Sequence, residues 1–130
     1  MLNIADAYPK EAAIRSWNRT VRLVRDEEIA IIDRFDLRAA MCESSMQLMT
    51  PCQVTVNDGV VMLDTVRFGR DRVSGSAKVN YDREAFDVRV ESVEITDDKL
   101  GSVWGDHLNR IVFVAKDVTL HGTWELRITR

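Results

Sequence analysis

The sequence predicts an all-β protein, namely a two-layer antiparallel β-sandwich of about ten strands with one or two short helical turns. Apolar and polar residues alternate with a period of two in most segments of the chain, as they do in strands with one buried face. Turn-forming residues separate these segments about every ten residues. No apolar stripe with helical spacing is longer than a turn or two. Strands of this kind bury their apolar faces when two sheets pack face to face.

Two long strands and a shorter one are predicted in the N-terminal part of the chain. Ser16–Val24 places three apolar residues on the face expected to be buried, namely Trp17, Val21 and Leu23. Residues 29–37 repeat the alternation, with Asp33 as the exception on the apolar face. A third strand at residues 46–49 stops before Pro51, because proline cannot donate a hydrogen bond to a central ladder.

A hairpin and a long one-sided strand are predicted in the middle of the chain. Residues 53–63 read as two short strands around Asn57-Asp58-Gly59, residues that accept the positive φ values of a tight turn. Residues 73–81 then alternate without a break, which predicts a single strand. We expect the ring of Tyr81 to lie inside, with its hydroxyl at the rim.

The C-terminal part is predicted to hold three strands, with helical turns confined to residues 9–13 and 100–108. The apolar parity changes within the first of these strands, between two sets of residues: Phe86, Val88 and Val90, then Val93 and Ile95. A β-bulge near Glu91 or Ser92 would keep one face buried. Residues 111–115 are apolar on both faces and suit a central strand, and residues 118–128 alternate as a final strand.

Composition and charge narrow the possible partners. The chain has 130 residues, 45% apolar and 30% charged, with a net charge of −3. We expect one domain over residues 1–130 that folds without a disulfide framework, a metal or a cofactor. The charge provides no attraction to nucleic acid. No apolar run approaches the roughly 18 residues of a membrane helix, and the N-terminal residues lack the pattern of a secretory signal peptide.

The residue pattern contains no recognisable catalytic or metal site. A nucleophilic triad needs a histidine within reach of a serine or cysteine, and His121 lies on the polar face of the last predicted strand. His107 falls in a predicted loop or short turn, where we favour a capping or packing role over a ligand-contacting or catalytic one. Asp97, Asp98 and Asp106 lack the spacing of a calcium loop. Carboxylate pairs such as those among Asp33, Asp36 and Glu43 are expected by chance in so acidic a chain.

Trp104 is the one tryptophan not assigned to the core. Trp17 and Trp124 sit on apolar strand faces, whereas Trp104 precedes Gly105 in a predicted non-strand segment, where it could face a ligand or a neighbouring domain. Arginines cluster around the Gly69 turn, at positions 67, 70 and 72. A solvated turn is the preferred interpretation of that cluster, and contact with an acidic polymer through Arg70 is the alternative.

The two cysteines, Cys42 and Cys52, are too few for a disulfide framework and have no zinc spacing. We expect two half-buried thiols, with a bond between them as the alternative.

The order of several short motifs resembles a known family. They are Ile4-Ala5-Asp6-Ala7-Tyr8-Pro9, Trp17-Asn18-Arg19-Thr20-Val21, Ile31-Ile32-Asp33-Arg34-Phe35, Leu48-Met49-Thr50, Tyr81-Asp82 followed by Phe86, Leu100 followed by Trp104-Gly105, and Arg110-Ile111. Together they resemble the C-terminal β-sandwich of the heparinase II/III-like polysaccharide lyases, over about Ile4 to Ile128. Each motif is short, and the specificity lies in their order.

The resemblance implies a piece of a larger bacterial enzyme, periplasmic or extracellular, that cleaves acidic, glycosaminoglycan-like polysaccharides by β-elimination. That reaction needs a base, a group that neutralises the uronic carboxylate and an acid. In the family these are residues of a helical toroid and an early β region, and none maps onto this sequence. The chain is therefore expected to be the non-catalytic C-terminal part, which packs against and stabilises the preceding domains of the same polypeptide. It is not expected to be an enzyme by itself.

Two other functions remain open. A carbohydrate-binding module would contact an acidic polysaccharide through Trp104, with His107 and Arg70 nearby, and requires Trp104 to be exposed beside polar groups. A self-contained enzyme requires His107 or Tyr81 in a cleft beside a base. A structural module instead requires an exposed apolar patch with a polar rim. From the resemblance, Tyr8-Pro9 and the Trp17 strand are expected where the chain arrives from a preceding domain.

Overall fold

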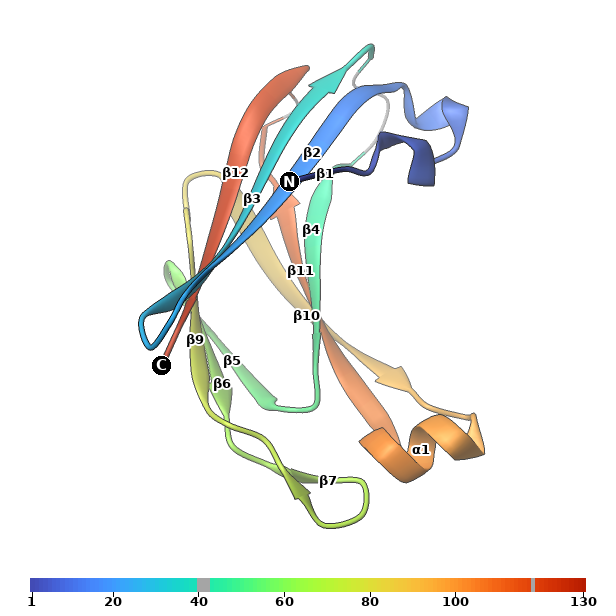
Figure 1. Ribbon diagram of the computed structural model, residues 1–130, viewed down its shortest axis with the longest axis vertical. Helices are drawn as coiled ribbons and strands as arrows, with labels where there is room; N and C mark the ends of the chain where they lie inside the picture. Colours follow the sequence, from blue (N-terminus) through green and yellow to red (C-terminus); the bar gives the residue numbers. More distant parts are fainter. Residues whose placement is uncertain (40–42, 118) are drawn as a thin grey trace.

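The predicted all-β sandwich with a few helical turns is confirmed by a computed structural model, which describes residues 1–39, 43–117 and 119–130 (Figure 1). Within these residues the strands form a seven-stranded sheet, a three-stranded sheet and a two-stranded ribbon, and every pairing is antiparallel. The larger sheet has the order β1-β2-β3-β12-β9-β6-β5, and the smaller one has the order β10-β11-β4.

The elements have the following bounds. The large sheet contains β1 (Leu2–Asn3), β2 (Ile14–Val24), β3 (Glu28–Leu37), β12 (His121–Thr129), β9 (Ala77–Tyr81), β6 (Val60–Asp64) and β5 (Gln53–Asn57). The small sheet contains β10 (Phe86–Glu94), β11 (His107–Ala115) and β4 (Ser45–Thr50), and the ribbon contains β7 (Arg67–Phe68) and β8 (Arg72–Val73). The described residues also form two 3₁₀ turns, η1 (Ala5–Ala7) and η2 (Lys10–Ala12), and one helix, α1 (Asp98–Trp104).

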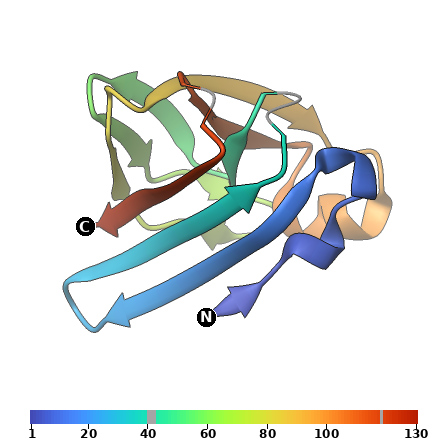
Figure 2. The same ribbon diagram turned by 90° about the horizontal axis from the view of Figure 1, so that it is seen from above.

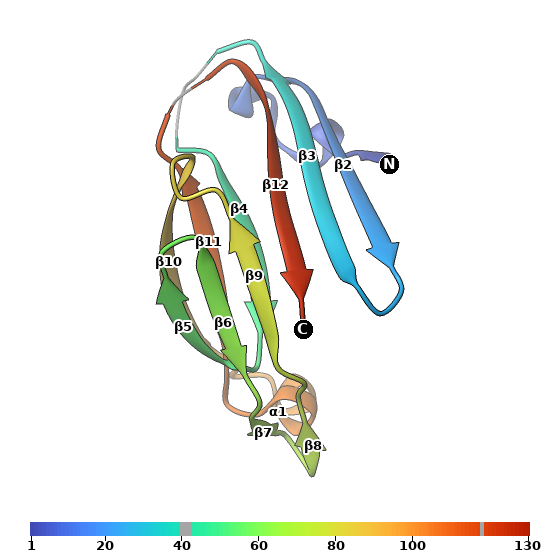
Figure 3. The ribbon, with the colours of Figure 1, turned by 90° about the vertical axis from the view of Figure 1, so that its left-hand side faces the viewer.

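The two sheets do not cover each other completely. Figures 2 and 3 show the small sheet lying against the part of the large sheet that contains β12, β9 and β6, while the β2–β3 hairpin stands away from it. The ribbon and α1 lie together at the opposite end of the molecule from η1 and η2 (Figure 1). A sheet of three strands is too narrow to cover seven, because neighbouring strands are only about 4.8 Å apart.

The main core lies between the sheets. Its buried members are Met46, Val61, Val79, Phe86, Ile111, Phe113 and Leu126. β11 pairs with a strand on each side, and Ile111–Phe113 is buried throughout, which confirms the predicted central strand. The ring of Tyr81 packs edge-on against Phe113, and its hydroxyl donates to the carbonyl of Asn57 over 2.9 Å, as predicted.

A second cluster is aromatic and lies toward the β2 edge. Trp17 and Phe35 are buried, with ring centroids 5.2 Å apart, and Trp124 lies 4.4 Å from Phe35. Phe35 is directly opposite Gly122 in the β3–β12 ladder. A Cβ atom at Gly122 would approach the Phe35 ring to 2.9 Å, so the glycine provides the space that this ring occupies.

The prediction of one unbroken strand at residues 73–81 is wrong, because the two ends of this segment belong to different sheets. Arg72–Val73 pairs with Arg67–Phe68 as the ribbon, whereas Ala77–Tyr81 joins the large sheet. The Ser74 hydroxyl accepts a hydrogen bond from the backbone N–H of Val66 over 2.9 Å. Val73 is consequently exposed and does not face the core.

The predicted β-bulge near Glu91 or Ser92 is also wrong. The β10–β11 register runs without a shift from Phe86 opposite Ala115 to Glu94 opposite His107. Val93 therefore points to the other face of the sheet, where it lies opposite Leu108, and both side chains are half-buried. Cross-strand pairing thus reduces the exposure of Val93 without an extra residue.

Both helical predictions are confirmed in type but not in length. η2 falls within the predicted turn at residues 9–13. α1 begins after Asp97, whose side chain accepts from the N–H of Leu100 over 2.8 Å, and it ends at Trp104. Residues 107 and 108 belong to β11, so the predicted extension of the helix to Leu108 is wrong.

The last strand is shorter than predicted. β12 begins at His121, which is exposed and lies opposite Asp36. Leu120 precedes the strand and is exposed, and Val118 lies outside the described residues.

Candidate functional site

The three residues singled out from the sequence as possible glycan contacts lie at the α1 end of the molecule. Trp104 and His107 line one cleft of about 540 Å³. Arg70 lines an adjoining cleft of about 480 Å³, and the two clefts share Gly69, Gly105 and Asp106. The helix, the start of β11 and the β7–β8 turn meet here (Figure 1).

Backbone packing holds this end of the molecule together. Gly69 has φ +56°, and a Cβ atom there would lie 2.3 Å from the carbonyl oxygen of Val103 in the last turn of α1. Gly105 ends the helix with φ +92°. Both glycines adopt the left-handed region that other residues avoid. The β7–β8 turn therefore rests directly on the end of the helix, with Arg70 displayed at its tip.

Trp104 is 37% exposed, but one of its ring faces is occupied. Its ring stacks on Phe68 of β7, with centroids 5.6 Å apart and an interplanar angle of 10°. An offset stack of this kind stabilises the contact between α1 and the ribbon. Trp104 therefore has the partial exposure that the carbohydrate-binding alternative requires, together with a packing role that the sequence pattern did not indicate.

His107 is the first residue of β11, not a loop residue as predicted. Its ring Nδ1 lies 2.6 Å from Oδ1 of Asp106, and this hydrogen bond with His107 lowers the pKa of Asp106 below its ordinary value. Tyr81 packs instead on Phe113, which lies about 20 Å farther along β11 at the usual strand rise. The structure does not bring His107 and Tyr81 together.

The acidic residues considered from the sequence serve separate interactions. Asp36 pairs with Arg15 and Glu43 pairs with Arg89, each over 3.1 Å. Asp97 caps α1. Within the described ranges, no three His, Cys, Asp or Glu side chains gather as a metal ion would require.

Asp33 is the most deeply buried of the charged groups. Its carboxylate has 0% exposure and accepts from Nε and Nη2 of Arg19 over 2.7 and 2.6 Å and from Nε1 of Trp17 over 3.0 Å. The hydrogen bond with Asp33 raises the pKa of Arg19. Sequence parity placed Asp33 on the apolar face, as the structure confirms, but its partners could not be assigned from parity alone.

Arg19 also lines a cleft between the two sheets. This cleft of about 410 Å³ opens between β2 and the start of β4, with Tyr8, Trp17 and Gln47 in its walls. The rings of Tyr8 and Trp17 are stacked at 6.2 Å. The cleft thus borders the aromatic cluster through Trp17.

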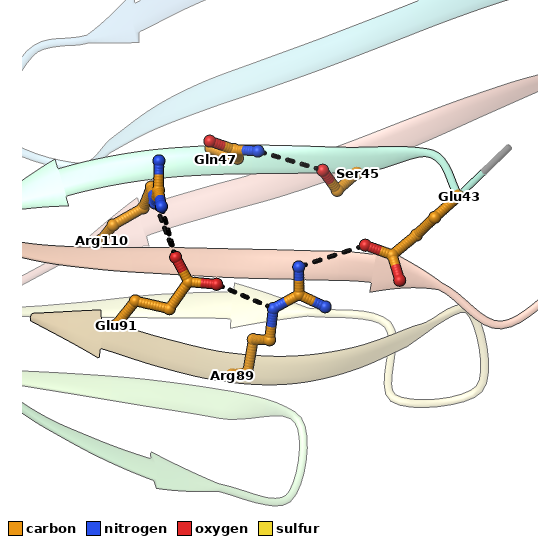
Figure 4. A network of polar contacts seen from close by, with 6 residues as sticks. All are labelled: Glu43, Ser45, Gln47, Arg89, Glu91 and Arg110. Atoms are coloured by element: carbon orange, nitrogen blue, oxygen red, sulfur yellow. Dashed lines mark hydrogen bonds and ion pairs between the residues drawn. The ribbon is translucent and has the colours of Figure 1, made fainter.

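The outer face of the small sheet carries a network of ion pairs (Figure 4). Glu91 accepts from Nε of Arg110 over 2.9 Å and from Nε of Arg89 over 3.0 Å, and Arg89 also pairs with Glu43. These contacts lower the pKa of Glu91, with Arg110 as the largest cause. Val112 lies directly opposite Arg89 and is buried beneath this network.

An apolar strip is exposed on the inner face of the large sheet, beyond the reach of the small one. We call it the inner strip, and it consists of Leu2, Val21, Leu23 and Ile29. Val21 is 62% and Leu23 72% exposed, so the predicted burial of both is wrong. They have the predicted parity, because they lie opposite Ile31 and Ile29 of β3, but no strand of the small sheet covers them. Alternation predicts a face but not what packs on it.

The inner strip continues into a shallow groove of about 190 Å³ beside the C-terminus. Leu23, Ile29 and Ile128 line its apolar part, and Asp26 and Glu27 of the β2–β3 turn border it. The strip is thus an apolar surface with a polar rim.

Cys52 is buried, so its predicted half-burial is wrong. Cys42 lies outside the described residues, so the possibility of a bond between the two stays a prediction.

No protein-family model matches this chain, and no curated protein is detectably similar to it. Among the described helices, none has the length and apolar character needed to cross a membrane.

Proposed function

We propose that this chain is the non-catalytic C-terminal β-sandwich of a heparinase II/III-like polysaccharide lyase, periplasmic or extracellular, and that it packs against the preceding domains of that enzyme. The observation that carries the proposal is the inner strip. Contiguous exposed apolar surface with a polar rim is typical of a surface that binds another protein domain. The ordered motifs, from Ile4 to Ile128, support the choice of family.

The energetics favour a covered strip. Burying a valine or leucine side chain completely contributes roughly 1.5–3 kcal/mol, and Val21 and Leu23 are both more than half exposed. They are neighbours on one strand face, next to Ile29, so a single apposed surface could cover them together. A domain that docked on the inner strip would pack on the inner face of the large sheet, the face that also contacts the core.

A non-catalytic role is consistent with the polar groups in the clefts. β-Elimination needs a base, an acid and a group that neutralises a carboxylate, all within reach of one sugar. His107 is engaged with Asp106, and the Tyr81 hydroxyl donates to the carbonyl of Asn57 at the rim of the core. We therefore expect no unsaturated product, read by ultraviolet absorbance, when the 130-residue chain is incubated with uronic polymers. Absorbance that rises with chain concentration would contradict this.

The proposal is tested in the polypeptide that contains this sequence. The reading frame upstream of the Met1 codon is expected to encode several hundred residues of helical toroid. In that full-length protein, the double substitution Val21→Ser and Leu23→Ser should lower the melting temperature, because it weakens docking. In the 130-residue chain alone it should have little effect, because both side chains are already exposed.

Met49→Ser provides the matched control for that experiment. Met49 is also exposed but lies opposite Arg110, on the outer face of the small sheet. Equal effects of the double substitution and of Met49→Ser on the full-length protein would contradict docking through the inner strip.

A second candidate function, a carbohydrate-binding module for acidic glycans, is favoured by the clefts at the α1 end. Trp104, His107 and Arg70 line adjoining clefts there. Calorimetry with acidic and neutral polysaccharides tests it. Arg70→Ala and His107→Ala are informative because both residues are exposed, and Trp104→Ala reports on stacking. The absence of heat with every glycan would eliminate this candidate.

A further inference from the structure

The free side of β2 is only partly paired. β1 covers it at Asn18 and Arg19, which lie opposite Asn3 and Leu2. β2 continues to Val24, and in the described part of the chain no strand lies beside Thr20–Val24 on that side. An edge of this length is a template for another strand.

The backbone groups of Val21 and Leu23 point toward this free side. The N–H of Ile4 donates to the carbonyl of Trp17 over 2.8 Å, so the backbone groups of Trp17 face β1. Along a strand these groups alternate between its two sides with a period of two. Those of Val21 and Leu23 therefore face the same side as those of Trp17, beyond the end of β1.

The exposed edge has less of the protection that edge strands usually have. Natural edges are blunted by charged residues, prolines, bulges or short length. β10, at the edge of the small sheet, carries Asp87, Arg89 and Glu91. The segment Thr20–Val24 instead has one charged residue, Arg22, on the face opposite Val21 and Leu23. It combines open hydrogen-bonding groups with the exposed apolar side chains of Val21 and Leu23. An edge with so little protection is suited to being covered.

We propose that Thr20–Val24 receives an added antiparallel strand that continues the line of β1. The inference rests on the proposed function, and the occupant is an extended segment of the preceding lyase domain. The register is set by the existing β1–β2 pairing, in which Leu2 lies opposite Arg19. This register places apolar residues of the added strand opposite Val21 and Leu23. It places a polar or acidic residue opposite Arg22, which forms an ion pair with Glu28, as Arg127 also does.

Hydrogen exchange on extended chains tests the edge directly. The probe is the 130-residue chain with Thr-Val-Glu-Val placed before Met1, so that each valine falls opposite Val21 or Leu23. The control extension is Val-Glu-Val-Thr, with the same composition and the opposite alternation. We expect the amides of Val21 and Leu23 to exchange at least about tenfold more slowly with the first extension than with the control. The amide of Arg22, which faces β3, serves as the internal reference.

Two results of that experiment would overturn the inference. One is equal exchange at Val21 and Leu23 with both extensions. The other is protection in the unextended chain that grows with protein concentration, together with a dimer in light scattering, since a second copy would then occupy the edge.

A pair of substitutions in the full-length lyase separates this inference from the proposed function. Leu23→Pro and Leu23→Thr both remove the leucine side chain, but only proline removes the N–H that faces the added strand. We expect proteolysis at the domain junction to be about tenfold faster with Leu23→Pro than with Leu23→Thr, once each 130-residue variant is shown to fold. Equal acceleration by both would overturn strand addition and retain docking. No acceleration by either would overturn both.

Discussion

Asp33 and Arg19 lie directly opposite each other on β3 and β2, and the arginine donates two hydrogen bonds to the buried carboxylate. Trp17 donates a third, so both carboxylate oxygens have partners. Arginine is suited to this geometry because its planar donors match a carboxylate. The interaction joins the aromatic cluster to the inner face of β2, beside the inner strip.

Loss of Arg19 should destabilise the protein strongly. Arg19→Met leaves the Asp33 carboxylate buried with only Trp17 as a side-chain donor, and an uncompensated buried charge costs about 3 kcal/mol or more. Urea unfolding of the variant should show a correspondingly lower midpoint. A cost below about 1 kcal/mol, the range of surface ion pairs, would contradict the geometry.

Removal of both charges should cost less than removal of the arginine alone. In the double variant Arg19→Met and Asp33→Leu no charge remains to be desolvated, and apolar replacement of a buried pair is often neutral. The same urea measurement should therefore place the double variant above Arg19→Met in stability. If the double variant were less stable than Arg19→Met, the attraction between Arg19 and Asp33 would contribute more to the free energy of unfolding than the desolvation of the two charges costs.

A methyl group at Gly69 should loosen the α1 end. Gly69→Ala places its Cβ within 2.3 Å of the Val103 carbonyl at a φ of +56°, and overpacking with backbone strain costs about 1–3 kcal/mol. Gly101→Ala is the matched control, because nothing lies within 4 Å of its Cβ position. Alanine in the helix interior should stabilise by roughly 0.5–1 kcal/mol. Thermal unfolding that ranks the two variants in the reverse order would contradict the close approach of turn and helix.

Gly122→Ala should disturb the aromatic cluster. The new methyl group would meet the Phe35 ring at 2.9 Å, and displacing that ring from Trp124 costs about 1–3 kcal/mol. Near-ultraviolet circular dichroism should change, because the tryptophan environment changes. An unchanged spectrum at full stability would mean that the Phe35 ring does not occupy this space.

Local patterns predicted the strands better than they predicted what covers them. The hairpin around Gly59 and the central strand at residues 111–115 follow from turn chemistry and from apolar residues on both faces. Alternation could not reveal that the small sheet stops short of Val21 and Leu23, because the width of a sheet depends on pairings distant in sequence. The bulge near Ser92 was wrongly predicted for the same reason, since local alternation does not show which side chains a distant partner strand covers.

The site was predictable only in part. Trp104, His107 and Arg70 line adjoining clefts because α1, β11 and the ribbon meet, and the sequence placed all three outside the core. The stack of Trp104 on Phe68 and the contact of Gly69 with Val103 are tertiary, and no local signal indicates them. The inner strip was missed for the same reason.

The acid titration of Glu91 should depend more on Arg110 than on Arg89. Both arginines lower the pKa of Glu91 below its ordinary value of 4.5, and the hydrogen bond from Arg110 is the larger cause. Carboxyl resonances followed by NMR should therefore show a larger rise in the pKa of Glu91 with Arg110→Met than with Arg89→Met. Because the folded pKa is depressed, the stabilisation is present above 4.5 and is lost as the pH falls through the folded pKa. Arg110→Met should flatten stability against pH in that window, and a larger pKa rise with Arg89→Met would contradict the geometry of Figure 4.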